Sequence, residues 1–314
     1  MKSTNQHRAY CFGLTVGVIA LALLYHFVGV SVWAGTSPSL FRWLYANWSS
    51  ESMDAAVDYS HGIVIPFVSL WLLWRKRAAL KEVLAAPRPH AFGIVLWALA
   101  ILMHFVGLRA QLAHLSAISL IVALWGLVWT FVGAAAAKLT LFPFAFLLFA
   151  VPIGFLAQAT FPLRLFGSLT ATGILNGIGI ETMRRGTAVF STAGEGFALD
   201  VADPCSGIRS LMTLMALAAG YAYVFKTRWF ERWFLFAMSL PIAVVANIGR
   251  IVGIAIVARF LGQDTGMKIY HDYSGYLVFI LAVLLVMGVD RAMDRAKAGW
   301  MRLRRAGDGP IDPS

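Results

Sequence analysis

Charged residues are scarce in this sequence. They make up 13% of its 314 residues, whereas hydrophobic residues make up 60%. Soluble domains carry about 25% charged and about 45–50% apolar residues, so this composition excludes an ordinary soluble protein. Several apolar runs reach or approach the roughly 20 residues that cross a bilayer. We therefore expect an all-α polytopic membrane protein.

Cysteines and clustered metal ligands are scarce as well. The chain has two cysteines, Cys11 and Cys205, which excludes a disulfide framework. The expected topology puts them at opposite faces of the membrane, too far apart to bridge. No His-x-x-x-His or Glu-Glu pair falls in an apolar run, so the ligands of an intramembrane metalloprotease are missing. The sequence predicts neither a metal nor a cofactor.

A soluble basic domain is also missing, although the formal net charge is +11. The basic residues cluster beside apolar runs, and the positive-inside rule explains this better than nucleic-acid binding does. In an eight-span topology, most of the 26 Lys and Arg residues fall on the side of the two termini. We expect a multi-pass protein of the lipid bilayer, with both termini in the cytoplasm and no nucleic-acid partner.

Eight apolar runs predict about eight transmembrane helices. The runs cover about 11–34, 61–74, 91–108, 112–133, 139–157, 207–225, 233–258 and 273–289. A polar and aromatic loop is expected over about 35–60. Together the runs predict a single transmembrane domain over 1–290, followed by a basic cytoplasmic tail over 291–314.

The longest external segment covers 158–206. Its first part is moderately amphipathic and is expected to lie along the membrane surface. Two short β-prone runs then flank "AGEG", a pattern that predicts a β-hairpin just before the sixth helix. Because single hairpins are only marginally stable alone, we expect this one to pack on the membrane domain.

Cys205 stands in "DPCSGIRS", at the start of the sixth run. Asp203 fits the N-cap of a helix and Pro204 its first position. The thiol would then lie in the field of the helix N-terminus, which favours the nucleophilic thiolate. The alternative is that Cys205 is a small buried hydrophobic residue, as we assume for Cys11.

Two further segments place costly polar residues in apolar runs. Asn247 and Arg250 in "ANIGRIVGI" share a helix face, and a buried arginine needs a partner or a water-filled cavity. His271 in "KIYHDYSGY" opens the eighth run from the outer side and could act as a general acid or base. The alternatives are an arginine that snorkels to the interface and an ordinary interfacial histidine. His61 and His104 lie at or in other runs without further chemistry nearby.

The predicted topology brings Cys205, Arg250 and His271 to the outer face from three different spans. A thiolate with a histidine acid/base is the pairing of cysteine hydrolases, and an arginine can stabilise the thiolate or an oxyanion. Acyl transfer at the outer face is the simplest chemistry that fits these residues.

The segments "ADPCSGIRS", "ANIGRIVGI" and "HDYSGY" resemble the three signature regions of the exosortase/archaeosortase family of membrane transpeptidases. The Cys-Ser-Gly region, with Ser206 and Gly207, is the most specific of them. The resemblance implies that Cys205 is the nucleophile, His271 the acid/base and Arg250 the third catalytic residue. Asp203, Asn247 and Asp272 are candidates for orienting these groups.

The resemblance also implies a setting and partners. The histidine, where archaeal members carry a second arginine, points to a bacterial exosortase in the inner membrane with its site facing the periplasm. Its substrates would be secreted proteins with a C-terminal tripartite tail: a motif such as Pro-Glu-Pro, a transmembrane helix and a basic cluster. The acceptor nucleophile stays open between an exopolysaccharide, a lipid-linked group and water. One departure is Asp203-Pro204, where the family commonly has a glutamate and a small residue.

A protein of another class also fits the sequence. A non-catalytic transporter or polysaccharide-assembly component would use Arg250 as a charge in a translocation path. Such a protein should tolerate Cys205→Ala, whereas a transpeptidase should not.

Overall fold

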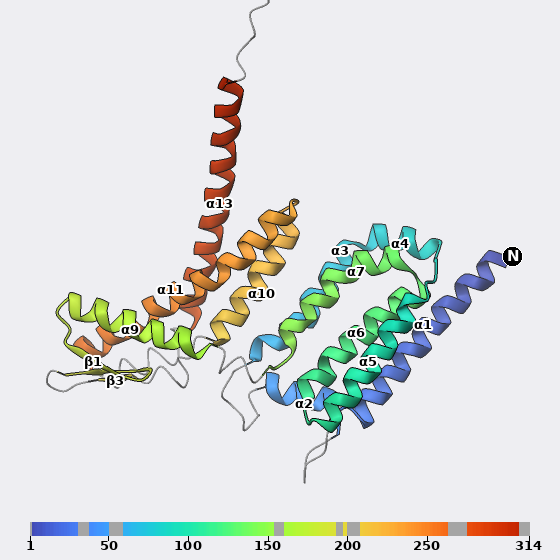
Figure 1. Ribbon diagram of the computed structural model, residues 1–314, viewed down its shortest axis with the longest axis horizontal. Coiled ribbons are helices and arrows are strands. Elements are labelled where there is room, and N and C mark those ends of the chain that lie inside the picture. The colour runs from blue at the N-terminus through green and yellow to red at the C-terminus, as the bar shows by residue number, and fades with distance from the viewer. Residues whose placement is uncertain are drawn as a thin grey trace, which may run out of the picture. The chain divides into compact units, whose positions relative to one another are not determined.

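The computed structural model describes residues 2–30, 38–49, 59–153, 160–192, 197–199, 208–262 and 275–307. Its chain forms two compact units, Met1–Gly154 and Phe155–Ser314 (Figure 1). Each unit is described by itself. Helices account for most of both units, as the composition predicts.

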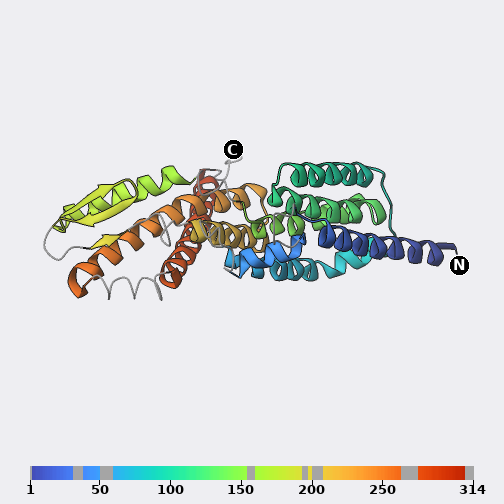
Figure 2. The ribbon, with the colours of Figure 1, turned by 90° about the horizontal axis from the view of Figure 1, so that it is seen from below.

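The first unit is helical throughout its described part. In chain order it contains α1 (Lys2–Phe27), α2 (Leu40–Trp48), the 3₁₀ turn η1 (Ser60–Ile63), α3 (Val64–Arg75), α4 (Arg77–Ala85), α5 (Phe92–Arg109), α6 (Ala113–Phe131), α7 (Ala134–Phe146) and the 3₁₀ turn η2 (Leu147–Ala150). Figure 2 shows α5, α6 and α1 lying side by side.

Small residues let α5 and α6 approach closely. A Cβ at Gly93 would stand 2.5 Å from the backbone nitrogen of Thr130, so a larger residue has no room there. At the other end of the pair, a Cβ at Gly107 would stand 3.0 Å from the backbone nitrogen of Ser116. Such close backbone contact is typical of helix pairs in membranes, where van der Waals packing replaces the hydrophobic effect.

Hydrogen bonds between helices add to this packing. The Tyr25 hydroxyl on α1 lies 2.7 Å from Ser119 Oγ on α6, and Ser119 Oγ donates to the carbonyl of Ser116. Ser69 Oγ on α3 donates to the carbonyl of Pro143 on α7 at 2.7 Å. These bonds satisfy polar groups that would be costly in an apolar environment.

The second unit combines helices with a small sheet. It contains α9 (Phe161–Gly177), β1 (Thr182–Arg185), β2 (Ala188–Ser191), β3 (Ala198–Leu199), α10 (Ile208–Phe225), α11 (Trp229–Leu261) and α13 (Gly275–Gly307). The strands form an antiparallel sheet in the order β1-β2-β3.

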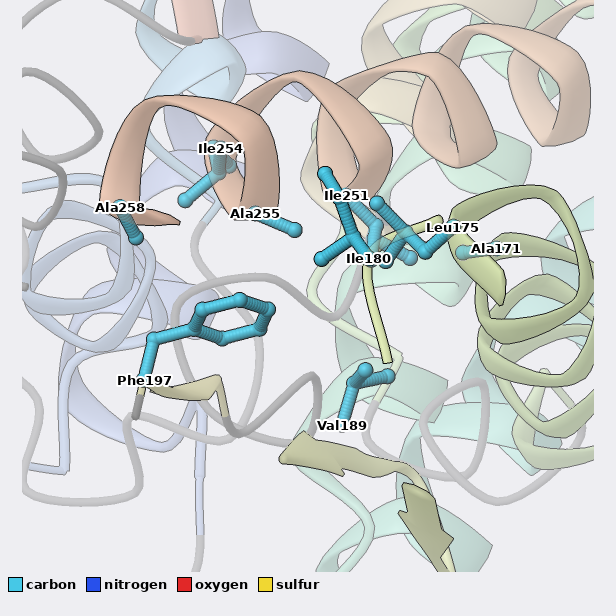
Figure 3. Packing of buried hydrophobic residues seen from close by; sticks show 9 residues of the cluster. All are labelled: Ala171, Leu175, Ile180, Val189, Phe197, Ile251, Ile254, Ala255 and Ala258. Atoms are coloured by element: carbon cyan, nitrogen blue, oxygen red, sulfur yellow. The ribbon is translucent and has the colours of Figure 1, made fainter. Parts of the chain in front are cut away.

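The sheet and α9 pack on the last third of α11. Val189 and Phe197, on and beside the strands, share a buried cluster with Ile251 and Ala255 of α11 and Leu175 of α9 (Figure 3). Ile180, where the chain leaves α9, belongs to the same cluster. The sheet therefore has a helical support, which a two- or three-stranded ribbon needs for stability.

Each of the eight predicted apolar runs overlaps a described helix, with different bounds. Three of them, α5, α6 and α11, are long and apolar enough to cross a membrane by length and composition. The shorter apolar helices are Phe12–Phe27, Ala134–Ala150 and Leu211–Phe225. The exact number of spans stays a prediction, and so does the single domain over 1–290.

Three features differ from the expected outline. Helix α2 forms inside the segment expected to be a loop, because apolar side chains such as Leu40 are buried against the first unit. Helix α13 continues to Gly307, well beyond the predicted end at 289. The sheet has three strands in place of the two of the predicted hairpin, because β1 pairs with β2 as well. The four residues of the predicted turn, 193–196, lie outside the described part.

Candidate functional site

Helix α11 carries the two predicted site residues that the structure describes. Asn247 and Arg250 lie in the second half of this 33-residue helix. Asn247 is 8% exposed, and its Oδ1 has no hydrogen-bond partner among the described residues. Arg250 is partly buried. A buried amide oxygen without a partner is costly, so it marks a place where a donor from elsewhere is expected.

Helix α9 closes one side of this site. A Cβ at Gly167 would stand 3.8 Å from Asn247 Nδ2 and 4.0 Å from Ile248 Cγ1, so α9 and α11 are in contact here. Ser168, also buried, donates its Oγ–H to the carbonyl of Leu165 within α9. The small residues of α9 therefore face the polar position on α11.

The starts of α10 and α13 lie at the same end of their helix bundle as Arg250. Leu211 of α10, Ala246 of α11 and Ala282 of α13 belong to one buried cluster. Arg250 is one turn beyond Ala246, and α10 begins one turn before Leu211, running antiparallel to α11. Helix α13 runs in the direction of α10 and begins two turns before Ala282.

The remaining predicted site residues lie outside the described part of the chain. They are Asp203, Cys205, Ser206, Gly207, His271 and Asp272. Each of them precedes the start of α10 or of α13 by a few residues. The structure therefore places Asn247 and Arg250 towards the end of the bundle at which α10 and α13 begin, and it does not test the contacts of the thiol or the imidazole.

Arg164 is a residue that the sequence analysis did not single out. It lies on α9, one turn before Ser168, in the helix that packs on Asn247. Its guanidinium carbon lies 5.6 Å above the Phe161 ring. The signal in the sequence is a single cation inside "FPLRLFGSL", a segment predicted to lie along the membrane surface. Arg164 is therefore a cation on α9, the helix that contacts Asn247 through Gly167.

Within the described residues, no group of three or more His, Cys, Asp and Glu side chains could hold a metal ion. His104 is buried in the first unit against the Tyr25 ring, with the ring centroids 4.4 Å apart. His104 belongs to the first unit, whereas Arg250 belongs to the second.

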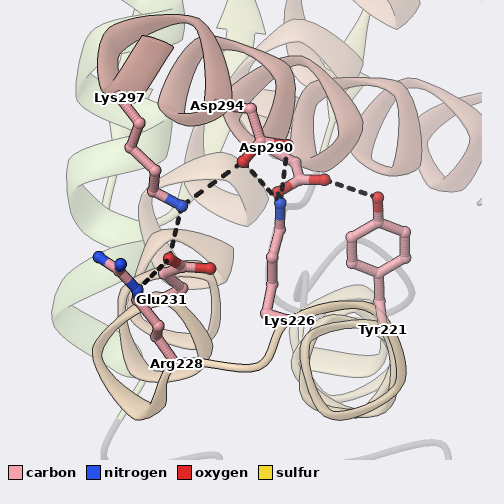
Figure 4. A network of polar contacts seen from close by, with 7 residues as sticks. All are labelled: Tyr221, Lys226, Arg228, Glu231, Asp290, Asp294 and Lys297. Carbon is pink, nitrogen blue, oxygen red and sulfur yellow. Dashed lines mark hydrogen bonds and ion pairs between the residues drawn. The ribbon is translucent and has the colours of Figure 1, made fainter. Parts of the chain in front are cut away.

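A charged network holds the opposite end of the bundle (Figure 4). Lys226, between α10 and α11, pairs with Asp290 at 2.5 Å and with Asp294 at 2.9 Å, both on α13. Tyr221 of α10 donates its hydroxyl proton to Asp290 at 2.8 Å. Lys226 and Asp290 are both buried, so these contacts join the three helices at a point where an unpaired charge would be costly.

The network shifts the pKa values of two groups just outside the apolar parts of their helices. Burial works to lower the pKa of Lys226, but the hydrogen bonds and charges of Asp290 and Asp294 raise it above the ordinary value. The pKa of Asp294 is held below its ordinary value, first by the hydrogen bond from Lys226. Both groups are therefore charged at neutral pH.

The fold and the site define a class: a mostly helical membrane protein with polar residues inside an apolar helix. The family model described as transmembrane exosortase (Exosortase_EpsH) matches residues 48–288. This match covers most of the chain and contains all three signature segments, so the protein belongs to the transmembrane exosortase family. No curated protein and no solved structure matches the chain.

Proposed function

We propose that this protein is a cysteine transpeptidase that cleaves the C-terminal sorting signals of secreted proteins, of the Pro-Glu-Pro type. The observation that carries the proposal is the position of Arg250. It lies in a long apolar helix, at the end of the bundle where the chain segments with Cys205 and His271 enter α10 and α13. The family match over 48–288 supports the same reading.

The proposed reaction begins with attack of the Cys205 thiolate on the carbonyl carbon of the scissile peptide bond. Arg250 stabilises the negative charge of the tetrahedral intermediate, together with backbone N–H groups at the start of α10. The carbon–nitrogen bond then breaks, and His271 gives a proton to the leaving amine. An acceptor nucleophile then gives its proton to His271, attacks the thioester carbonyl and takes the acyl group, and the carbon–sulfur bond breaks to release the thiolate.

Supporting roles follow from position in the sequence. Asp203 and Asp272 flank the two proposed reacting residues, and Ser206 and Gly207 complete the segment at the helix start. Asn247 lies one turn before Arg250, with a buried oxygen available to a donor. We propose that it orients the reacting groups.

The proposed cellular setting is the bacterial inner membrane, with the site at the periplasmic face and both termini in the cytoplasm. The substrate's transmembrane tail would enter from the lipid. The sheet β1-β2-β3 would bind the recognition motif by strand addition, because an extended peptide can pair with a free sheet edge. The acceptor is a group on an exopolysaccharide or on a lipid-linked carrier, with water as the alternative.

A second function is favoured by the same arginine. A cation in an apolar helix also fits a membrane transport or exopolysaccharide-assembly protein without catalytic activity. The thiol separates the two, since only the transpeptidase needs Cys205.

The test is co-expression of the full chain with a secreted protein that bears a Pro-Glu-Pro tail. The size and the C-terminal mass of the product are compared for wild type, Cys205→Ala and the matched control Cys11→Ala. We expect wild type and Cys11→Ala to process the substrate and Cys205→Ala to leave it intact. Equal processing by all three would reject the transpeptidase in favour of the second function.

A further inference from the structure

An open groove of about 740 Å³ lies between the start of α11 and the second half of α13. It belongs to the opposite end of α11 from Arg250, about twenty residues or roughly 30 Å away along the helix. Neither the proposed catalytic residues nor the sheet contributes to it. Its lining combines aromatic and aliphatic side chains with three charged residues.

The apolar part of the lining is broad and open. Phe230 and Trp300 are 64% and 60% exposed, and Phe234 and Met293 also line the groove. Aromatic residues gather where a membrane helix meets the headgroup region, because their rings suit a boundary between lipid and water. An apolar wall of this kind in a membrane protein fits an acyl chain.

The charged part of the lining presents cations. The Glu231 carboxylate is largely buried and lies 2.6 Å from Lys297 Nζ and 4.0 Å from Arg228 Nε. This carboxylate fixes both cations beside the apolar wall. The Arg228 side chain is 80% exposed, and Figure 4 shows its two other nitrogens directed away from Glu231. A guanidinium in this position has further N–H groups to offer an anion.

The surroundings reinforce the positive charge. On α13, Arg291 directly precedes the lining residue Ala292 and Arg302 follows Trp300 by two positions, and both arginines are exposed. The exposed Asp294, in contrast, pairs with Lys297 Nζ at 3.5 Å. An occupant therefore needs an apolar chain for Phe230 and Trp300 and an anionic head for Arg228. A soluble phosphate has only the second, and a zwitterionic lipid has no net charge to match the surface.

We propose that this groove is a binding site for an anionic phospholipid. The acyl chain lies against Phe230, Phe234 and Trp300, and the phosphate accepts hydrogen bonds from Arg228 and lies close to Lys297. Basic pockets between membrane helices are established places for anionic headgroups in other proteins. This site does not depend on the proposed transpeptidase activity.

The test uses the purified full-length protein in detergent and titrates it with phosphatidylglycerol, phosphatidylcholine or inorganic phosphate. Bound lipid is counted by native mass spectrometry. Arg228→Gln should weaken phosphatidylglycerol binding about fivefold, the effect of one cation near an anionic lipid. Arg295→Gln is the matched control, because it removes the same charge from an exposed position on α13 that does not line the groove.

Trp300→Ala supplies a second, independent variant. It should weaken binding while leaving every charge in place, which separates the apolar part of the site from general surface charge. Thermal melts of each variant without lipid confirm that the fold is retained, and the exposure of Arg228 and Trp300 favours this.

Three outcomes would overturn the proposal. One is an equal loss of binding in Arg228→Gln and Arg295→Gln, which would mean diffuse surface attraction. The second is equal affinity for phosphatidylcholine. The third is displacement of phosphatidylglycerol by inorganic phosphate at equal concentration, which would remove the role of the acyl chain.

Discussion

At the scale of single residues, Arg250 is the charged member of the candidate site that the structure describes. Its place in an apolar helix makes a structural role costly unless a partner or water meets the guanidinium. Asn247 is buried one turn away with an oxygen that lacks a donor among the described residues. Asn247 contacts α9, and Arg250 follows it by three residues on the same face of α11, so this face carries two polar groups inside the second unit.

Replacement of Arg250 tests this assignment. We expect Arg250→Ala to lower the rate of substrate processing by about 100-fold, because one donor to an oxyanion contributes this much in other acyl-transfer enzymes. Arg250→Lys should recover part of the rate, since it keeps the charge and loses the planar fork. The rate is measured with a tailed substrate at matched expression levels.

Arg259 provides the control on the same helix. It lies in the last turn of α11 and is exposed. Arg259→Ala should leave the rate unchanged. A comparable loss in Arg259→Ala would show that general charge on α11 matters and that Arg250 has no special role.

At the scale of elements, a single lysine makes ion pairs that connect three helices. Lys226 joins α10 and α11 to two carboxylates of α13, and its removal would leave Asp290 as a buried, uncompensated charge. Loss of one partner from a buried ion pair costs about 3–5 kcal/mol. Apolar contacts between these helices are not directional. The ion pairs of Lys226 therefore help to fix how α10, α11 and α13 are aligned along their axes.

We expect Lys226→Met to lower the melting temperature of the protein in detergent, and Asp290→Asn in the same chain to restore part of the loss. Thermal unfolding followed by circular dichroism measures both. Equal melting temperatures for wild type and Lys226→Met would contradict the buried ion pair. Lys297→Met, at a more exposed position of the same network, is expected to have the smaller effect.

The pKa shifts also set the pH range of this contribution. Because the pKa of Asp294 is lowered from 3.8, its contribution is complete above that value and is lost as the pH falls through the folded pKa. Because the pKa of Lys226 is raised from 10.5, its contribution is complete below that value and is lost as the pH rises through the folded pKa. The network should therefore add no pH dependence to stability between about pH 5 and 9.

At the scale of the whole molecule, the proposed topology sets where substrates and acceptors can reach the protein. It puts the sheet outside the cell membrane and the end of α13 inside. The exposed positions Arg184 on β1 and Arg302 on α13 suit a test of this arrangement. A cysteine at either position replaces an exposed arginine, so the two substitutions are matched in charge and exposure.

Single-cysteine variants Arg184→Cys and Arg302→Cys, in a chain with Cys11→Ala and Cys205→Ala, are treated with a membrane-impermeant thiol reagent in spheroplasts. We expect labelling of Arg184→Cys in intact spheroplasts and of Arg302→Cys only after lysis. The reverse pattern would invert the topology and would move the proposed site to the cytoplasmic face. Labelling of both before lysis would reject the placement of α13.

Particular elements show how far sequence reasoning reached. Apolar runs predicted α5, α6 and α11 because a membrane helix must satisfy its backbone internally and therefore has a length that composition reveals. Helix α2 was missed because nine residues with polar neighbours resemble a loop, and the structure shows the helix through the Ser39 cap at its N-terminus and the burial of Leu40. Arg164 was not singled out because the amphipathic pattern of α9 does not show that this helix packs on α11.

The sequence by itself determined that this is a helical membrane protein, and its three signature segments determined the exosortase family. Composition and motif are local properties, and a single chain displays them directly. Only the tertiary structure decided that α9 packs on Asn247, that α13 extends to Gly307, and that Lys226 meets the carboxylates of Asp290 and Asp294, 64 and 68 residues further along the chain. These contacts depend on which helix faces pack against each other. Side-chain packing between segments distant in sequence decides this.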